Sequence, residues 1–264
     1  MHLVIGLGPI GGNVGAHLAE LGRKVYGYDF DQDRIRAWAE ETASPAGSDL
    51  AAVEWPSVDS VHVAVRLADQ VSSVFEALQA HTAQPLTVFV HTTLAPADAR
   101  KILSSAPDNW RVFEAPVSGG PQGARHGSMT VFLAGPAPTD SENTLLADIS
   151  GRVFRMESYG QPALVKLLNN ALATYNLAAT ARMLDLAAEH GVPAEDLFEV
   201  IGVSTGQSWM GDNLVDVQYD LLLKDVDLLR GELGSLPTAD LDDVEPAILR
   251  ARALLSSDSG RERA

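Results

Sequence analysis

The 264-residue chain contains no cysteine. This absence excludes disulfide bridges and thiolate metal sites, and it favours a reducing, cytoplasmic setting. No apolar run approaches the roughly 20 residues that a membrane-spanning helix needs, and no basic leader precedes Gly6, so we expect neither a transmembrane helix nor a signal peptide. No cluster of His, Asp and Glu has the spacing of metal ligands, and we expect no metal.

Positive charge is also scarce. The chain has 19 Lys and Arg against 35 Asp and Glu, which gives a formal net charge of -16 at pH 7. Nucleic acids and anionic membranes require a basic surface, so we expect neither as a partner. With 46% apolar and 20% charged residues, the composition is that of a globular protein long enough to bury a core. Because the net charge is negative, an anionic substrate has to be held by local groups.

A glycine-rich segment follows the first apolar run. Residues 3–5 have the composition of a buried parallel strand, and apolar residues recur at helical spacing after the segment, up to Gly22. In this context the first glycine permits a tight turn, the second lets the backbone approach a pyrophosphate, and the third lets helix and strand pack closely. The order strand, loop, helix predicts a dinucleotide-binding unit whose loop is Gly6, Leu7, Gly8, Pro9, Ile10 and Gly11.

The second apolar run, residues 24–28, ends at an acidic residue. This residue is Asp29, which follows Gly6 at close to the spacing of roughly 20 expected for the carboxylate that binds the adenosine ribose. A carboxylate at that position would repel a 2′-phosphate. The next residue is Phe30 rather than Arg, and Asp31 adds negative charge. We therefore predict that the cofactor is NAD rather than NADP.

Strand and helix patterns alternate through residues 1–158, which predicts a mostly parallel sheet with helices on both faces. We expect strands over 3–5, 24–28, 61–65, 86–90, 111–114, 130–133 and 153–155, and helices over 71–78 and 96–103. Ligands bind at the carboxyl ends of such strands, which brings Val65, Arg66, the 91–93 segment and the 116–120 segment to one rim. We expect Arg66 to be solvated, and His91 to be packed rather than to transfer protons.

Ser118, Gly119 and Gly120 form a second glycine-rich signature on this rim. A hydroxyl group and successive backbone N–H groups can bind an anion without a cationic side chain, so a carboxylate is a plausible guest. A glycine-rich turn without a ligand explains the same three residues equally well.

Strand patterns stop after Gly160, and a long helix is predicted over 163–190 because that stretch contains no internal Gly or Pro. It would span roughly 40 Å. Lys166 and Asn170 are four residues apart and therefore share one face. Lys166 stands among apolar residues, either solvated or lining a cleft. We expect further helices over 195–201, 216–233 and 241–255, an all-helical domain over 159–264, and a homodimer or homotetramer.

Four segments, in order, resemble the β-hydroxyacid dehydrogenase family, which includes 3-hydroxyisobutyrate dehydrogenase, tartronate semialdehyde reductase and 6-phosphogluconate dehydrogenase. They are GLGPIGG from Gly6, APVSGG from Ala115, KLLNN from Lys166 and KDVDL from Lys224. The match runs from residue 1 to about 237. It is closer to the 3-hydroxyisobutyrate branch, because 6-phosphogluconate dehydrogenase usually carries a histidine where Asn169 and Asn170 stand.

The resemblance implies an α/β Rossmann-type N-terminal domain, an all-α C-terminal domain, and NAD(P)-dependent oxidation of a short β-hydroxy carboxylate. It implies that Lys166 is the catalytic acid/base, that Asn170 orients the substrate, and that the Ser118 segment binds the substrate carboxylate. Cofactor contacts are implied for Val65, Thr93 and Lys224, with Asp225 helping to place Lys224.

The chain departs from the family pattern at three places. Val65 and Arg66 stand where the family often has leucine and proline, and Pro162 stands where a glycine is usual. The segment after Pro237 is shortened, which puts the substrate in more doubt than the reaction. Three alternatives stay open: a 6-phosphogluconate dehydrogenase-like enzyme, an imine or carbonyl reductase on the same fold, and a non-catalytic dinucleotide sensor. Lys166 argues against the reductase, which generally lacks that lysine.

Overall fold

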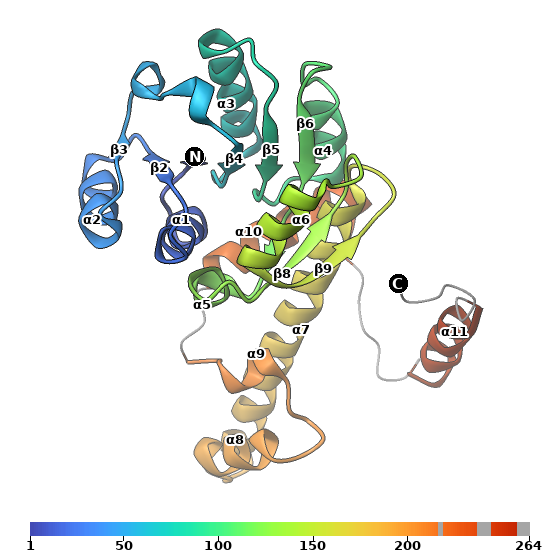
Figure 1. The fold of residues 1–264 in the computed structure, drawn as a ribbon. Helices are drawn as coiled ribbons and strands as arrows, with labels where there is room; N and C mark the ends of the chain where they lie inside the picture. The colour runs from blue at the N-terminus through green and yellow to red at the C-terminus, as the bar shows by residue number, and fades with distance from the viewer. Residues whose placement is uncertain (216–218, 237–243, 258–264) are drawn as a thin grey trace.

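The computed structural model describes residues 1–215, 219–236 and 244–257 (Figure 1). A parallel sheet occupies the N-terminal half, with strand order β3-β2-β1-β4-β5-β6. This order places β1 and β4 side by side at the centre, where the chain switches from one half of the sheet to the other. The strands are β1 (His2–Ile5), β2 (Val25–Tyr28), β3 (Ala46–Gly47), β4 (Ser60–Val63), β5 (Thr87–Val90) and β6 (Arg111–Glu114).

Helices cover both faces of this sheet, because alternate residues of each strand point to opposite faces. Leu3 and Ile5 belong to a core cluster with side chains of α3 and α4, whereas Val4 belongs to a second cluster with α1 and α2. The flanking helices are α1 (Gly11–Glu20), α2 (Gln32–Thr42), α3 (Ala68–His81) and α4 (Pro96–Leu103), and two short 3-10 helices, η1 (Leu50–Ala52) and η2 (Trp55–Ser57), precede β4. The prediction of a parallel sheet with flanking helices is confirmed.

The strands expected over 130–133 and 153–155 form, but they do not join the parallel sheet. They lie in a separate sheet of order β7-β8-β9, in which β7 and β8 are antiparallel. Gly119 and Gly120, with φ of 113° and 63°, turn the chain after β7, the first strand of this sheet, before β8 pairs with it in the opposite direction. The elements are β7 (Val117–Ser118), α5 (Gly120–Arg125), β8 (Met129–Leu133), α6 (Asp140–Ile149) and β9 (Ser150–Arg155).

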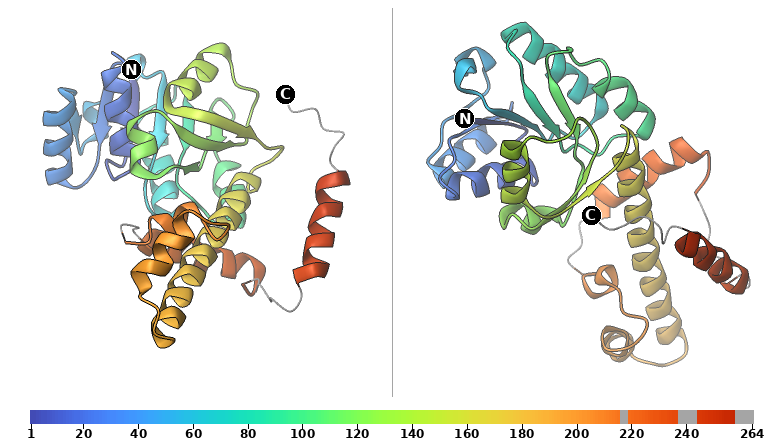
Figure 2. Two further views of the ribbon diagram at one scale, coloured as in Figure 1. Left: turned by 90° about the horizontal axis from the view of Figure 1, so that it is seen from below. Right: turned by 45° about the vertical axis from the view of Figure 1, so that its right-hand side comes forward.

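Within the described residues, every element after Arg155 is helical. The long helix α7 (Gln161–Glu189) leaves the sheets, and the three helices that follow it in the described chain pack against it (Figure 2). None of the described helices is long and apolar enough to cross a membrane. Residues 216–218 and 241–243 of the helices expected over 216–233 and 241–255 lie outside the described residues. The remaining helices are α8 (Ala194–Gly202), α9 (Trp209–Asp212), α10 (Tyr219–Leu233) and α11 (Val244–Ser257).

Candidate functional site

The glycine-rich loop between β1 and α1 has the geometry of a dinucleotide-binding turn. Gly6 has a φ of 94°, which L side chains rarely adopt. A Cβ at Gly11 would lie 2.1 Å from the carbonyl oxygen of Gly6, so helix and strand can pack this closely only around glycine. Gly8 is open by contrast, because a Cβ there would meet only the Arg34 guanidinium, at 3.9 Å. The open backbone at the start of α1 therefore fits a pyrophosphate.

The carboxylate of Asp29 lies at the same end of the sheet. Its Oδ2 accepts a hydrogen bond from the Leu7 N–H at 2.8 Å, and its Oδ1 accepts one from the Asp31 N–H at 3.0 Å. Arg34, in the first turn of α2, places Nη1 3.8 Å from Asp29 Oδ2 and Nε 3.5 Å from Asp31 Oδ2. Sequence reasoning missed this cation. Its signal is an arginine in the first turn of the helix that follows Asp29.

The ends of β4 and β5 meet on the same rim. Thr92 Oγ1 donates to the carbonyl oxygen of Val65 at 2.8 Å, which ties the two strand ends together. Val65 and Thr93 are half-buried, and Arg66 is exposed in accordance with the expectation of a solvated arginine.

His91 is buried and hydrogen-bonded on both ring nitrogens. Nδ1 lies 2.9 Å from the carbonyl oxygen of Ala115, which can only accept, so Nδ1 carries the hydrogen. Nε2 then accepts from Nδ1 of His62 at 3.0 Å, and the two rings stack. Burial lowers the pKa of His91 to about 4 and the pKa of His62 well below its usual value, so both are neutral. This is the packed histidine that the sequence predicted.

Lys166 lies on α7 with 9% of its surface exposed. Leu167 is fully buried beside it, but Leu168 is 45% exposed. Leu168 points away from the buried side of α7, because consecutive residues of a helix point about 100° apart. Burial lowers the pKa of Lys166 to about 8, a fall that the negative charge of Asp225 opposes and the positive charge of Lys224 assists.

Side chains from α10 connect α7 to the parallel sheet. Asn170 Nδ2 donates to Asp225 Oδ2 at 2.6 Å, and Lys224 Nζ lies 3.3 Å from Asp225 Oδ1. Lys224 Nζ also donates to the carbonyl oxygen of Thr93 at 3.4 Å. Asp225 is buried, with 4% of its surface exposed. Asn170 and Lys224 thus contact one buried carboxylate, the charge of that carboxylate acts on Lys166, and Lys224 links it to Thr93.

The Ser118 segment lies on the second sheet. Ser118 is half-buried at the end of β7, whereas Gly119 and Gly120 are exposed. A Cβ at Gly120 would meet no atom within 4 Å, so the backbone there is open. In the described part of the chain, no hydrogen bond or ion pair joins this segment to Lys166.

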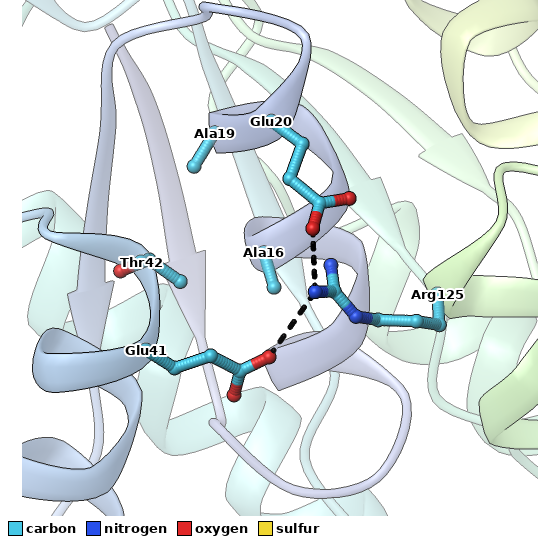
Figure 3. Close-up of a pocket in the computed structure, with 6 residues that line it drawn as sticks. All are labelled: Ala16, Ala19, Glu20, Glu41, Thr42 and Arg125. Carbon is cyan, nitrogen blue, oxygen red and sulfur yellow. Dashed lines mark hydrogen bonds and ion pairs between the residues drawn. The ribbon is translucent and has the colours of Figure 1, made fainter.

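A separate cavity of about 100 Å³ lies between α1, α2 and α5 (Figure 3). Arg125 enters it from α5, with Nη2 2.5 Å from Glu20 Oε1 and 3.4 Å from Glu41 Oε1. Two carboxylates neutralise this guanidinium, so the cavity is not an anion site. The ion pairs of Arg125 hold α5, and with it the glycines that precede α5, against α1 and α2.

Two family models match the chain. The model for the NAD binding domain of 6-phosphogluconate dehydrogenase matches residues 3–156. The model described as NAD-binding of NADP-dependent 3-hydroxyisobutyrate dehydrogenase matches residues 160–233. A nicotinamide dinucleotide is therefore the cofactor class, and the open loop at Gly8 fits it.

Individual proteins are similar over most of the chain. L-threonate dehydrogenase of Escherichia coli K12 is 30% identical over 242 residues, which cover 86% of this chain and 80% of that protein. 3-Hydroxyisobutyrate dehydrogenase of Pseudomonas aeruginosa is 30% identical over 210 residues, covering 78% and 70%. The crystal structure of a 3-hydroxyisobutyrate dehydrogenase from Salmonella typhimurium matches with a TM-score of 0.75 and 26% identity, covering 90% of this chain and 89% of that one.

Proposed function

The chain belongs to the β-hydroxyacid dehydrogenase family, and on that premise we propose that it reversibly oxidises the hydroxyl group of a short β-hydroxy carboxylate. The observation that carries the proposal is the buried group of Lys166, Asn170, Asp225 and Lys224, which contacts the end of β5 through Thr93. A buried lysine with a pKa of about 8 can give and take a proton near neutral pH.

Lys166 acts as the base in the oxidation direction. Its neutral amine accepts the hydroxyl proton while the carbon–oxygen double bond forms and a hydride leaves the substrate carbon. The bound nicotinamide supplies the two-electron acceptor. In reduction the lysine ammonium donates the proton to the carbonyl oxygen. With a pKa of about 8, roughly one amine in ten is neutral at pH 7, which is enough to sustain turnover.

The neighbouring groups position the substrate. Asn170 Nδ2 donates to Asp225, and the amide oxygen of Asn170 accepts from Asn169 Nδ2 at 3.3 Å, which leaves its second lone pair to accept from a substrate hydroxyl group. We propose that Ser118 and the N–H groups of Gly119 and Gly120 bind the carboxylate. Binding a short acid at both ends holds its reacting carbon against the nicotinamide. Such positioning supplies much of the rate acceleration in reactions of this kind.

The cofactor is NAD in this proposal. Asp29 would accept hydrogen bonds from the ribose hydroxyls, and Arg34 is engaged by Asp29 and Asp31 rather than free for a 2′-phosphate. In Asp29→Ser the carboxylate is lost and Arg34 gains freedom, so the ratio of kcat/KM with NADP to kcat/KM with NAD should rise at least roughly tenfold, equivalent to about 1.4 kcal/mol. Asp33→Ser, which removes an exposed acid of α2, the helix that carries Arg34, is the control. A wild-type preference for NADP contradicts the assignment.

Lys166→Ala tests the chemistry. Cofactor binding should persist, and turnover should fall by at least roughly a hundredfold, as expected when a general base is removed. Lys101→Ala, which removes an exposed lysine of α4, should change neither. If Lys166→Ala retains turnover, the mechanism is wrong.

The substrate class is tested with a panel read through NADH absorbance. L-Threonate and 3-hydroxyisobutyrate come first for oxidation, because related proteins carry those names. Tartronate semialdehyde comes first for reduction. If the protein binds NAD but turns over no hydroxy acid, semialdehyde or imine in the panel, a sensor role replaces the enzymatic one.

We also propose that the protein is a homodimer or a larger homo-oligomer. The support is the row of exposed apolar side chains on α7, whose members are Val165, Leu168, Leu172 and Tyr175.

A further inference from the structure

Glu114 is a buried carboxylate at the end of β6, with 2% of its surface exposed. Both of its oxygens accept hydrogen bonds from the start of α7. The Gly160 N–H donates to Oε2 at 2.6 Å, and the Ala163 N–H donates to Oε1 at 2.8 Å. A negative charge on a helix N-terminus is favourable because unpaired N–H groups and the helix dipole both point toward it.

The start of α7 cannot provide this cap itself. Gly160 is the N-cap residue, has a φ of 89° and carries no side chain. A Cβ there would lie 2.7 Å from Arg100 Nη1 and 2.9 Å from the carbonyl oxygen of Pro96, so no capping residue fits. Pro162 has no N–H to satisfy. The Gln161 N–H donates to the carbonyl oxygen of Ser158 at 3.3 Å, and the Gly160 and Ala163 N–H groups are capped by a residue some 50 positions earlier in the chain.

The same residue joins the two sheets. The Glu114 N–H donates to the carbonyl oxygen of Ala134 at 2.9 Å, and the Ala134 N–H donates back at 3.0 Å. Tyr159, just before α7, adds a hydrogen bond from its hydroxyl group to the carbonyl oxygen of Val112 on β6, at 2.9 Å. Glu114 is thus a junction between the parallel sheet, the second sheet and the helix that carries Lys166.

We propose that Glu114 is a positioning residue for the reaction: its carboxylate seats the first turn of α7 on the sheet and so sets where Lys166 and Asn170 lie. Lys166 follows Ala163 by three residues, less than one turn, so a tilt or fraying at the seat moves the Lys166 amine directly. This inference rests on the proposed function, in which Lys166 is the acid/base.

Glu142 provides a matched control. It is also a buried carboxylate, with 5% of its surface exposed, and it also caps a helix, because Oε2 accepts from the Thr139 N–H at the start of α6. Its other partners are Arg111, at 2.7 Å, and the Thr87 hydroxyl group, at 3.2 Å, and no hydrogen bond or ion pair joins it to α7 among the described residues. Glu114→Gln and Glu142→Gln each place an amide where a buried carboxylate accepted hydrogen bonds, and both should lower the melting temperature.

Only Glu114→Gln should impair catalysis. We expect its kcat to fall at least about tenfold, because a displacement of the reacting group by an ångström can cost a hundredfold. The Kd for NAD should stay within about twofold of wild type. Glu142→Gln should keep kcat within about twofold. If both variants lose the same thermal stability and both keep kcat, Glu114 is only structural and the proposal fails. If Glu114→Gln does not fold, Glu114→Asp, which keeps the charge with a shorter reach, is measured against the same limits.

A second measurement does not depend on turnover. The chain has four lysines, so reductive ¹³C-methylation gives few NMR signals, and Lys166→Arg assigns the one of interest. In wild type this signal should titrate near pH 8. In Glu114→Gln it should titrate at higher pH, since a loosened first turn admits water to the amine, and Glu142→Gln should match wild type. An unchanged titration in Glu114→Gln overturns the proposal. A wild type without turnover whose Lys166 titration still moves in Glu114→Gln refutes the proposed function alone.

Discussion

The chemistry of Lys166 depends on three opposing influences on one amine. Burial favours the neutral form most strongly, Asp225 favours the charged form, and Lys224 favours the neutral form. The ion pair of Asp225 with Lys224, at 3.3 Å, weakens the effect of both charges on Lys166. The hydrogen bond from Asn170 fixes the carboxylate in this position. The pKa of about 8 is therefore set by a group of residues from two helices rather than by α7 alone.

This balance predicts the pH dependence of the reaction. In oxidation Lys166 must be neutral, so kcat/KM should rise with pH and level off above about 8. In reduction it must be protonated, so kcat/KM should fall above the same pH. Asp225→Asn should move both limbs to lower pH, and Lys224→Gln should move both to higher pH. Initial rates from pH 6 to 10 in both directions measure this. If the pH profiles of kcat/KM stay unchanged in both variants, the α10 residues do not set the pKa of Lys166.

At the scale of elements, a buried polar chain runs through the parallel sheet. Nδ1 of His2 on β1 lies 2.8 Å from Ser60 Oγ on β4, which lies 3.2 Å from His62 Nε2. His62 then meets His91 after β5, and His91 meets the carbonyl oxygen of Ala115 after β6. Because the last acceptor is a backbone carbonyl, the chain cannot pass a proton to the substrate. It links four neighbouring strands, from the first residue of β1 to the segment that follows β6.

The two buried histidines of this hydrogen-bonded row predict that the protein loses stability in acid. His62 and His91 have pKa values in the folded state below the ordinary 6.5. Below pH 6.5 the two histidines are protonated in the unfolded state but stay neutral in the folded state. The free energy of unfolding should therefore fall as the pH drops toward about 4, by about 1.4 kcal/mol per pH unit for each histidine. Urea unfolding across this range measures the slope. His91→Asn, which keeps an N–H toward Ala115, should reduce it, whereas the exposed His190→Asn should not. An equal slope in all three proteins contradicts the assignment.

The elements that could be predicted are those whose signals are local. The glycine loop, the central strands and α7 all have patterns contained in a few consecutive residues. The helix α2 was missed because only Ile35 and Trp38 of its eleven residues are buried, which leaves little periodicity. The helix α6 has a capping box formed by Thr139 and Glu142, and this signal could have found it.

What could not be predicted depends on contacts between distant residues. Whether residues 130–133 join the parallel sheet depends on pairing partners, and a strand pattern does not identify its partner. The carboxylate of Glu114 meets α7 only after the chain has built the second sheet. The family resemblance of the KLLNN segment was therefore sufficient to nominate Lys166 and Asn170, whereas their surroundings required the structure.

At the scale of the whole molecule, the helical half buries little of its apolar surface. Among the residues that the structure describes, its core cluster consists of Leu167, Ala171 and Leu229 with a few partly buried neighbours. The four side chains of the α7 row follow one another at intervals of three, four and three residues, so they form a single stripe along the helix. Figures 1 and 2 show α7 extending away from both sheets. A stripe of this kind on a long helix is typical of a surface that a second subunit covers.

The stripe predicts that a single charge at its centre dissociates the protein. Leu172 is 61% exposed, so Leu172→Glu costs the isolated subunit little, whereas burial of an unpaired carboxylate in an interface is strongly unfavourable. Size-exclusion chromatography with light scattering should give an oligomer for wild type and a monomer for Leu172→Glu. Phe154→Glu, at a residue of β9 that is 46% exposed and lies outside α7, should stay oligomeric. A monomeric wild type, or an oligomeric Leu172→Glu, means that the stripe is not a subunit interface. If Leu172→Glu stays oligomeric, a surface other than the stripe joins the subunits.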